Sequence, residues 1–386
     1  MTTSISSSTT ISPPSNLSTS SRARTASKPG TTQNKPSTSG NVKEHDFFWT
    51  YTEEPHRTRR QAIIKAHPEV TKLCGPEPLT KYTVLLVVLI QLFCAFALQS
   101  TPILSWKFLL TAYIVGATAN QNLFLAIHEI SHNLAFRNAT ANRALAIFAN
   151  LPIGIPYSAS FRLMSPQPYH LTHHKSLGID GLDTDLPTSF EAFFLDSLLG
   201  KSFFATFQIF FYAIRPIFVY RVPFTYCHIA NIVAQVVFDY LLVTKCSPNS
   251  LYYLIISSFL AGSLHPCAGH FIAEHYLLDP PSSRNPDSLT KTTLPETFSY
   301  YGPLNLLTYN VGLHNEHHDF PAVPWTRLPA LHQLAKEFYV DLPQHSSWVS
   351  VIWQFVWDKD VGLSCRVKRS GKGKKLAEWE QTEVQA

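Results

Sequence analysis

The sequence predicts an all-α integral membrane protein with two transmembrane helical hairpins, which give four transmembrane helices, and a helical cap on the cytosolic side. The first observation behind this fold class is a set of four apolar windows, each close to the roughly 20 residues that a helix needs to cross a hydrocarbon core. The second is the distribution of Lys and Arg, which are nearly absent from these windows and from the turns that join them. Both features are typical of multi-pass membrane proteins.

The chain begins with a polar segment at 1–45. It is rich in Ser and Thr and has no apolar run with which to bury a core, so we expect a disordered tail. It also lacks the apolar stretch of a secretory signal peptide. We expect a cytosolic segment at 46–81 to follow it, before the first apolar window begins.

The apolar windows occur in two pairs, each joined by a short turn. They cover residues 82–98, 103–127, 225–243 and 251–268. The pairs predict one transmembrane hairpin over 82–127 and a second over 225–268. A fifth apolar stretch, 203–220, is interrupted by Arg215 and Pro216, so we predict an interfacial or re-entrant segment there.

The basic residues predict the orientation of the hairpins. All but two of the 31 Lys and Arg residues lie outside them, and the exceptions are Lys107 and Lys245. Because positive charge is retained on the cytosolic side, both hairpin turns are expected to face the lumen. The net charge of +5 then reflects orientation and contact with anionic membrane lipid, and we expect no nucleic-acid partner.

Histidines gather where the chain leaves the apolar windows: 12 of the 17 lie between His128 and His318. Eight of them form one HxxxH and two HxxHH clusters, namely His128 and His132; His170, His173 and His174; His314, His317 and His318. Such spacings place imidazoles on one face of a helix. Because buried imidazoles without partners are costly, clustering of this kind predicts metal binding.

The first cluster also fits HExxH, the zinc-hydrolase pattern, with Glu129 as the general base. An intramembrane zinc protease would leave the other two clusters unexplained, since a catalytic zinc takes about three protein ligands. The one other ExxH, at residues 53–56, contains a proline and lies before the first apolar window, so no second transmembrane ExxH pairs with residues 129–132, which disfavours a carboxylate-rich di-iron bundle. We therefore predict a histidine-rich site for two metals in the cytosolic cap, with iron as the redox metal and the protease as a remote alternative.

Three more histidines lie at the end of the fourth window or shortly after it. His275 lies where that helix enters the cytosol, and we expect it to be a further metal ligand. His265 and His270 lie nearer the membrane and are open to two interpretations, as hydrogen-bond partners of a ligand or as packed structural residues.

Longer strings narrow the interpretation. They are DFFWTY at 46–51 followed by Pro55-His56 and Arg59-Arg60, NLPIGIPYSASF at 150–161, GHFIAEHY at 269–276 and SYYGPLNLLTYNVGLHNEHHDFP at 299–321. Together with the three histidine clusters, the chain resembles the membrane fatty-acyl desaturase and hydroxylase superfamily. Within it, the longer strings resemble the sphingolipid (dihydroceramide) delta-4 desaturases over about 46–358.

The resemblance implies an oxygen-dependent enzyme of the endoplasmic reticulum membrane, with its active site on the cytosolic face. Its reaction would convert dihydroceramide to ceramide by introducing a 4,5-trans double bond at a di-iron centre, with O2 as co-substrate. Electrons would come from NADH via cytochrome b5 reductase and cytochrome b5. A sphinganine C4-hydroxylase or a bifunctional desaturase/hydroxylase remains an alternative, because hydroxylation can start from the same hydrogen removal.

The resemblance also implies a set of nine iron ligands. They are His128, His132, His170, His173, His174, His275, His314, His317 and His318. The acidic residues Glu129, Glu274 and Glu316 match family positions too, but we assign them no catalytic role. Candidate walls of a substrate tunnel are 144–161 and 300–312.

The two parts of the expected cytosolic cap are 128–224, with the first two clusters, and 269–358, with the third. A basic flexible tail is expected at 359–386. Two apparent insertions relative to the resembled proteins lie at 163–167 and 279–297, and we expect the second to be a surface loop. The acidic residues of the loop after the second cluster are expected to be solvated; they are Asp180, Asp183 and Asp185.

Overall fold

The computed structural model describes residues 46–50, 52–157, 169–219, 225–281 and 294–369. These residues are mostly helical, as the all-α class predicts, and two short strand pairs are the exception among them. The tail at 1–45 and the insertion at 163–167 lie outside the described residues.

Within the described chain, three helical stretches are long and apolar enough to cross a membrane: α2 (Leu79–Ala97), α10 (Tyr226–Lys245) and the stretch Pro248–Ala273, which opens with α11 (Pro248–Ala261). Large apolar side chains of α2 and α10 point outward; Phe93 is 70% exposed and Val236 62%. Helices that expose apolar residues in this way are stable in lipid and not in water. The prediction of a helical membrane protein is confirmed at this level.

The second predicted window forms consecutive helical segments, α3 (Trp106–Leu110), the π-helical η2 (Thr111–Ala117) and α4 (Thr118–Ser131). It is not one of the three membrane-crossing stretches, so the fourth transmembrane helix and the cytosolic cap stay predictions. Gly116 allows η2 to approach α11 closely, because a Cβ there would overlap the side chain of Ser257. Most residues of α4 are buried, which places the first histidine cluster inside the protein.

The fifth apolar stretch is part of α9 (Leu198–Val219), one helix that contains Pro216 and is kinked at Phe207, where φ is −112° and ψ is 15°. It follows α8 (Ser189–Leu195), whose N-terminus is closed by a capping box between Thr188 and Glu191. Phe190 of α8 is 71% exposed. This apolar surface is compatible with the interfacial location predicted for the stretch.

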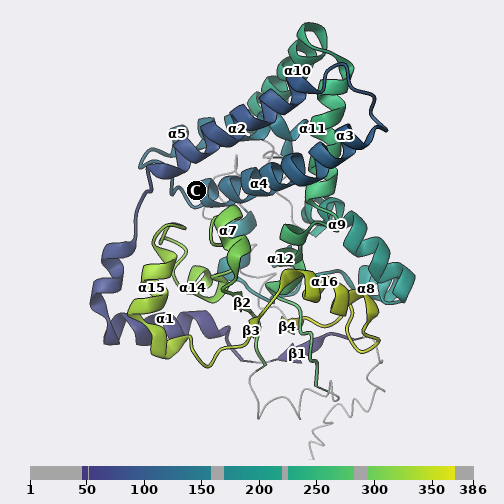
Figure 1. The fold of residues 1–386 in the computed structure, drawn as a ribbon. Helices are drawn as coiled ribbons and strands as arrows, with labels where there is room; N and C mark the ends of the chain where they lie inside the picture. Colours follow the sequence, from purple (N-terminus) through teal and green to yellow (C-terminus); the bar gives the residue numbers. More distant parts are fainter. Residues whose placement is uncertain (1–45, 51, 158–168, 220–224, 282–293, 370–386) are drawn as a thin grey trace, which may run out of the picture. The chain divides into compact units, whose positions relative to one another are not determined.

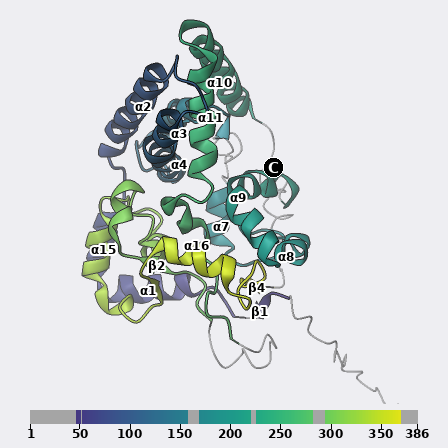
Figure 2. The same cartoon turned by 45° about the vertical axis from the view of Figure 1, so that its right-hand side comes forward.

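The remaining elements surround the histidine clusters. In chain order they are α1 (Pro55–Ala66), η1 (Pro68–Leu73), α5 (Ala139–Asn150), η3 (Leu151–Ile153), α7 (Tyr169–Lys175), η4 (Pro266–Gly269), α12 (His270–Ala273), η5 (Pro303–Leu307), α14 (His314–Asp319), α15 (Leu328–Leu334), η6 (Lys336–Phe338) and α16 (Trp348–Trp357). Figure 1 shows α7 and α12 between the long apolar helices on one side and α1, α14, α15 and α16 on the other. In the turned view, the long apolar helices α10 and α11 again lie above α7 and α16, and α1 lies below them (Figure 2). The main apolar core joins α4, α9, α12 and α16, with Phe204 and Phe355 among its fully buried side chains.

Two parallel strand pairs link distant parts of the chain. β1 (Phe48–Thr50) pairs with β4 (Val367–Arg369), and β2 (Ser299–Tyr300) pairs with β3 (Gln344–His345). Residues 367–369 of the tail predicted from residue 359 are therefore held in a strand pair. Their basic side chains are also buried: Lys368 is 2% exposed and Arg369 forms an ion pair with Glu296. A basic composition predicted a flexible segment here, but partners far away in the sequence hold these three residues.

Candidate metal centre

The structure brings all nine predicted site histidines together from four segments of the chain. The first group comprises His128, His132, His170, His174 and His317, with one ring nitrogen of each within 4.8 Å of the others. The second group comprises His173, His275 and His318, and His314 joins it through His275. Seven of the nine side chains are buried, and His132 and His174 are partly buried.

The two HxxHH helices each supply both groups. In α7, His170 and His174 lie one turn apart and join the first group, while His173 turns to the second. In α14 the division is reversed, because His317 joins the first group while His314 and His318 join the second. Consecutive residues on a helix point about 100° apart, so neighbouring imidazoles serve different groups.

Hydrogen bonds among the histidines cannot account for all the short distances between their ring nitrogens. His128 Nε2 lies 2.8 Å from His317 Nε2 and 3.1 Å from His170 Nε2, and His170 Nε2 lies 3.0 Å from His174 Nε2. Each imidazole nitrogen has either one proton or one lone pair. It can therefore take part in one such bond, yet the nitrogens of His128 and His170 each have two neighbours. The second group repeats this, with His275 Nε2 at 3.1 Å from His173 Nε2 and 3.0 Å from His314 Nε2.

One metal ion in each group would satisfy the ring nitrogens that hydrogen bonds leave unsatisfied. Nitrogen ligands at about 2.1 Å from one ion, at right angles, lie about 3.0 Å from each other. The distances between the Nε2 atoms match that edge length. The Nε2 atoms of His132 and His318 are buried and have no hydrogen-bond partner within the described part of the chain, as expected for a donor set built for cations. The residues present therefore fit two metal ions.

Outside the histidine groups, Asp183 fixes one imidazole. Its Oδ1 lies 2.8 Å from His173 Nδ1, and it also accepts hydrogen bonds from the backbone N–H groups of Gly178 and Asp185. Asp183 is 1% exposed, so the expectation of a fully solvated acidic loop was wrong for this residue. The loop folds inward at Gly178, which has a φ of 72°. The backbone carbonyl of Glu296 plays the same part for His275, at 3.0 Å from its Nδ1.

The electrostatics of the site favour cations. Burial lowers the pKa values of His170, His174 and His318 well below 6.5, and neighbouring imidazoles lower them further. These side chains are thus neutral at pH 7, the form that binds metal. Burial also lowers the pKa of His173, but the charges of Asp183 and Asp185 outweigh it and raise this pKa to about 9. Carboxylates that stabilise a proton on His173 also stabilise a metal ion beside it.

Glu129, the potential general base of the HExxH interpretation, belongs to neither histidine group. Its Oε2 accepts a hydrogen bond from the backbone N–H of Trp325 at 3.2 Å, and the side chain is buried. A hydrolase would need this carboxylate next to the metal and its water. The contact with Trp325 instead ties α4 to the segment after α14.

The two histidines left open by the sequence lie outside both groups. His265 caps η4, where its Nδ1 accepts a hydrogen bond from the backbone N–H of Cys267. His270 lies with its Nδ1 2.9 Å from Glu274 Oε1 and lines a small cavity beside the metal groups. His265 is therefore structural, whereas His270 borders the site.

Two cavities lie near the centre. The inner one, about 50 Å³, is bordered by members of both histidine groups and by Tyr157, Asp185, Tyr212 and His270 among others. The outer one, about 620 Å³, is apolar and lies between α8 and α9, with walls that include Phe207, Phe210 and Ile214. The inner cavity uses one predicted tunnel segment, through Tyr157 of 144–161. The segment 300–312 instead contributes to a separate small cavity, through Tyr309 and Val311.

Arg215 connects the two cavities. It lines the outer one, forms an ion pair with Glu191 at 2.9 Å, and donates to the backbone carbonyl of Asp185 at 3.1 Å. Asp185 in turn lines the inner cavity. The residue that interrupted the fifth apolar window is therefore a buried, paired side chain at the boundary between them.

Comparison with known proteins identifies the family. The family model for Fatty acid desaturase matches residues 104–349, and the one for Sphingolipid Delta4-desaturase matches residues 43–79. The chain is 56% identical over 343 residues to a sphingolipid delta(4)-desaturase of Komagataella phaffii, covering 89% of this chain and 93% of that protein. It is 43% identical over 340 residues to sphingolipid delta(4)-desaturase DES1 of Homo sapiens, covering 87% and 99%.

The chain belongs to the sphingolipid delta(4)-desaturase family. The predicted family and the predicted class of enzyme, an oxidoreductase of the desaturase type, are thereby confirmed. All nine site histidines lie within the match to the Fatty acid desaturase family.

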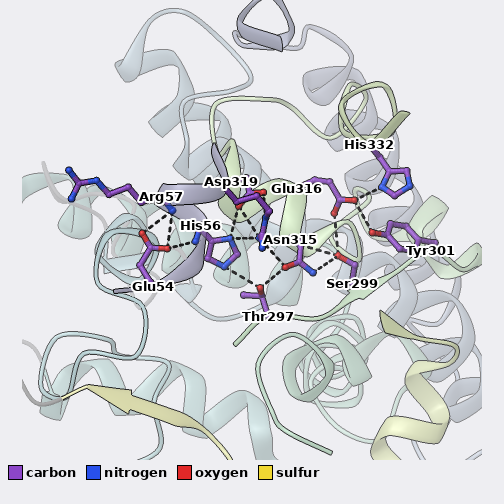
Figure 3. Close-up of polar contacts among 11 residues, drawn as sticks. Glu54, His56, Arg57, Thr297, Ser299, Tyr301, Asn315, Glu316, Asp319 and His332 are labelled. Atoms are coloured by element: carbon purple, nitrogen blue, oxygen red, sulfur yellow. Dashed lines mark hydrogen bonds and ion pairs between the residues drawn. The ribbon is translucent and has the colours of Figure 1, made fainter. Parts of the chain in front are cut away.

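The sequence did not predict which residues of this desaturase bind the non-histidine side chains of α14. Glu316 accepts a hydrogen bond from Tyr301 at 2.8 Å and lies 2.6 Å from His332 Nδ1 (Figure 3). On the next turn, Asp319 contacts His56 and Arg59. The sequence did offer a signal: an acidic residue, Asp319, directly follows the third histidine cluster, and His56 and Arg59 belong to the strings that carry the family resemblance.

Proposed function

We propose that this chain is a sphingolipid delta(4)-desaturase that converts dihydroceramide to ceramide by oxygen-dependent introduction of a 4,5-trans double bond. The observation that carries the proposal is that nine histidines gather in two groups beside the inner cavity. The names of the relatives, which are sphingolipid delta(4)-desaturases, supply the substrate class.

The proposed cofactor is a pair of iron ions, one held by each histidine group. Removal of hydrogen from an unactivated methylene has no acid–base route, so bound iron would supply the oxygen chemistry, with the reducing electrons taken from an external donor. The protein holds the ligands: Asp183 keeps the ring of His173 in place, and the Glu296 carbonyl does so for His275. The proposed electron path, from NADH via cytochrome b5 reductase and cytochrome b5, rests on the family resemblance.

The two cavities suit a lipid with a polar end near its reactive carbons. In the proposed reaction C4 is bonded to C3, which bears a hydroxyl group, so polar protein groups are needed beside the metals. Tyr157, Tyr212 and His270 meet this need at the inner cavity. The apolar outer cavity could accept a hydrocarbon chain, with about 0.8 kcal/mol gained for each methylene buried. Binding of the polar end at the inner cavity would then determine which carbons lie next to the metals.

The proposed location is the endoplasmic reticulum membrane, with four transmembrane helices and the histidine groups on the cytosolic face. The distribution of Lys and Arg supports this orientation. The apolar surfaces of α2 and α10 support contact with lipid.

Lipid mass spectrometry in cells that lack the endogenous activity tests the function. Expression of the chain should lower dihydroceramide and raise 4,5-unsaturated ceramide, and a His174→Ala variant should abolish the change. A His67→Ala variant is the matched control, since His67 lies outside both groups and pairs with Glu337 at the surface. Accumulation of phytoceramide would instead indicate C4-hydroxylation or a bifunctional enzyme. Unchanged sphingolipids in cells that contain the folded protein would refute both activities.

A further inference from the structure

The helix α14 is anchored on the side away from the metal groups. Three of its six residues are the histidines of the third cluster, and the other three, Asn315, Glu316 and Asp319, bind distant segments. A helix of six residues has little stability of its own. Its orientation, and with it the aim of three imidazoles, must come from these anchors.

His318 lacks the hydrogen bond that holds the rings of His173 and His275 in its group. His173 and His275 each have a hydrogen-bond partner at Nδ1 outside the histidine groups. Neither ring nitrogen of His318 has such a partner within the described residues. A single imidazole held only through its metal bond could turn about that bond, so another contact must set the plane of this ring.

In the described part of the chain, every ring that contacts His318 belongs to one of the histidine groups except that of His56, which belongs to neither. The His56 and His318 rings pack with their centroids 4.8 Å apart and their planes tilted by 34°. His56 is 4% exposed and comes from α1, more than 250 residues earlier in the chain. Packing against a flat neighbour restricts rotation of the His318 ring without using either of its nitrogens.

His56 is itself fixed on both sides (Figure 3). Its Nδ1 lies 2.8 Å from Asp319 Oδ1, and its Nε2 lies 3.1 Å from Thr297 Oγ1. Asp319 is fully buried and receives two hydrogen bonds from Arg59, at 2.7 and 3.0 Å. Arg59 and Thr297 both also donate to Asn315 Oδ1. The network therefore runs from α1 through the end of the 279–297 insertion to two residues of α14.

We propose that His56 is a positioning residue of the metal centre, which sets the plane of His318 and so directs one of its ring nitrogens at the metal of the second group. The Asp319–Arg59 ion pair holds His56 and the end of α14 in one orientation. His56 and Arg59 lie in the segment that the Sphingolipid Delta4-desaturase family model matches, residues 43–79. On this proposal, these two residues of the segment help to position a metal ligand. The inference rests on metal binding by the nine histidines and does not depend on which lipid is the substrate.

Iron binding by purified full-length protein tests the proposal. His56→Ala should bind iron at the second group about 10- to 100-fold more weakly, as for other residues that orient a metal ligand. At limiting iron the content should fall from two towards one ion per chain, with an altered spectroscopic signature for the remaining iron. His56→Phe keeps a flat ring and should restore most of the second iron. Arg57→Ala is the matched control, because Arg57 is on the same helix but exposed.

Three results would overturn the proposal. The first is a His56→Ala protein with two irons and an unchanged spectrum. The second is equal loss of both irons, which would indicate general damage to the fold. The third is a His56→Phe protein as defective as His56→Ala, which would exclude a role for ring packing. None of these measurements uses a lipid, so failure here is distinguishable from failure of the proposed reaction.

Discussion

Asp183→Asn is expected to weaken iron binding at the second histidine group without unfolding the protein. Asn has nearly the same shape, and its side-chain oxygen can still accept hydrogen bonds from His173 and from the backbone N–H of Asp185. What is lost is the negative charge, together with the second oxygen, which accepts the backbone N–H of Gly178. A hydrogen bond to a charged group contributes about 1.5–3 kcal/mol and a neutral one about 0.5–1.5 kcal/mol. The difference, about 1–1.5 kcal/mol, corresponds to roughly tenfold weaker binding.

The assay is competition for iron between the purified protein and a chelator of known affinity, with thermal unfolding followed in the same detergent. Asp180→Asn is the control, because Asp180 carries the same charge on the same loop but its side chain is 52% exposed and pairs with Lys368. It should leave iron binding unchanged. Asp183→Ala should lower the unfolding temperature as well, since two buried backbone N–H groups lose their acceptor. Equal iron affinity in Asp183→Asn and the unaltered protein would refute the electrostatic role of this carboxylate.

Two further substitutions test the interpretation of Glu129 and of the outer cavity. Glu129→Gln should retain iron and most activity, because the Gln side-chain oxygen can still accept the Trp325 N–H; abolished activity with iron retained would favour the hydrolase. Ile214→Trp should fill part of the outer cavity and shift the preference towards dihydroceramides with shorter chains, measured by competition between substrates of two chain lengths. Leu199→Trp is its control on the same helix, since this residue is 82% exposed and does not line the cavity; equal chain preference in both variants would argue against the cavity as a chain site.

The features that could be predicted from the sequence are those encoded locally. A spacing of three or four residues decides which imidazoles share a helix face, so the nine histidines could be predicted from three short strings and His275. Long apolar windows likewise predict helices such as α2 and α10 from their own composition. In both cases the relevant contacts lie within one or two helical turns.

The features that could not be predicted depend on pairings across the chain. His56 and Asp319 are 263 residues apart, and nothing in the neighbourhood of either indicates the other. Strands β1 and β4 have three residues each, too short for a periodic pattern to be visible. Asp183 lies in an acidic loop of the kind that is usually solvated, and only the inward turn at Gly178 brings it to His173.

The division of each HxxHH cluster between the two groups has a consequence for the separation of the metals. In α7 the residues one turn apart serve the first group, and in α14 they serve the second. Each helix thus spans both groups, so the distance between two metals bound there would be set by helix geometry and not by the flexibility of loops. A shift of either helix by one residue would rotate its imidazoles by about 100° and disrupt both groups at once.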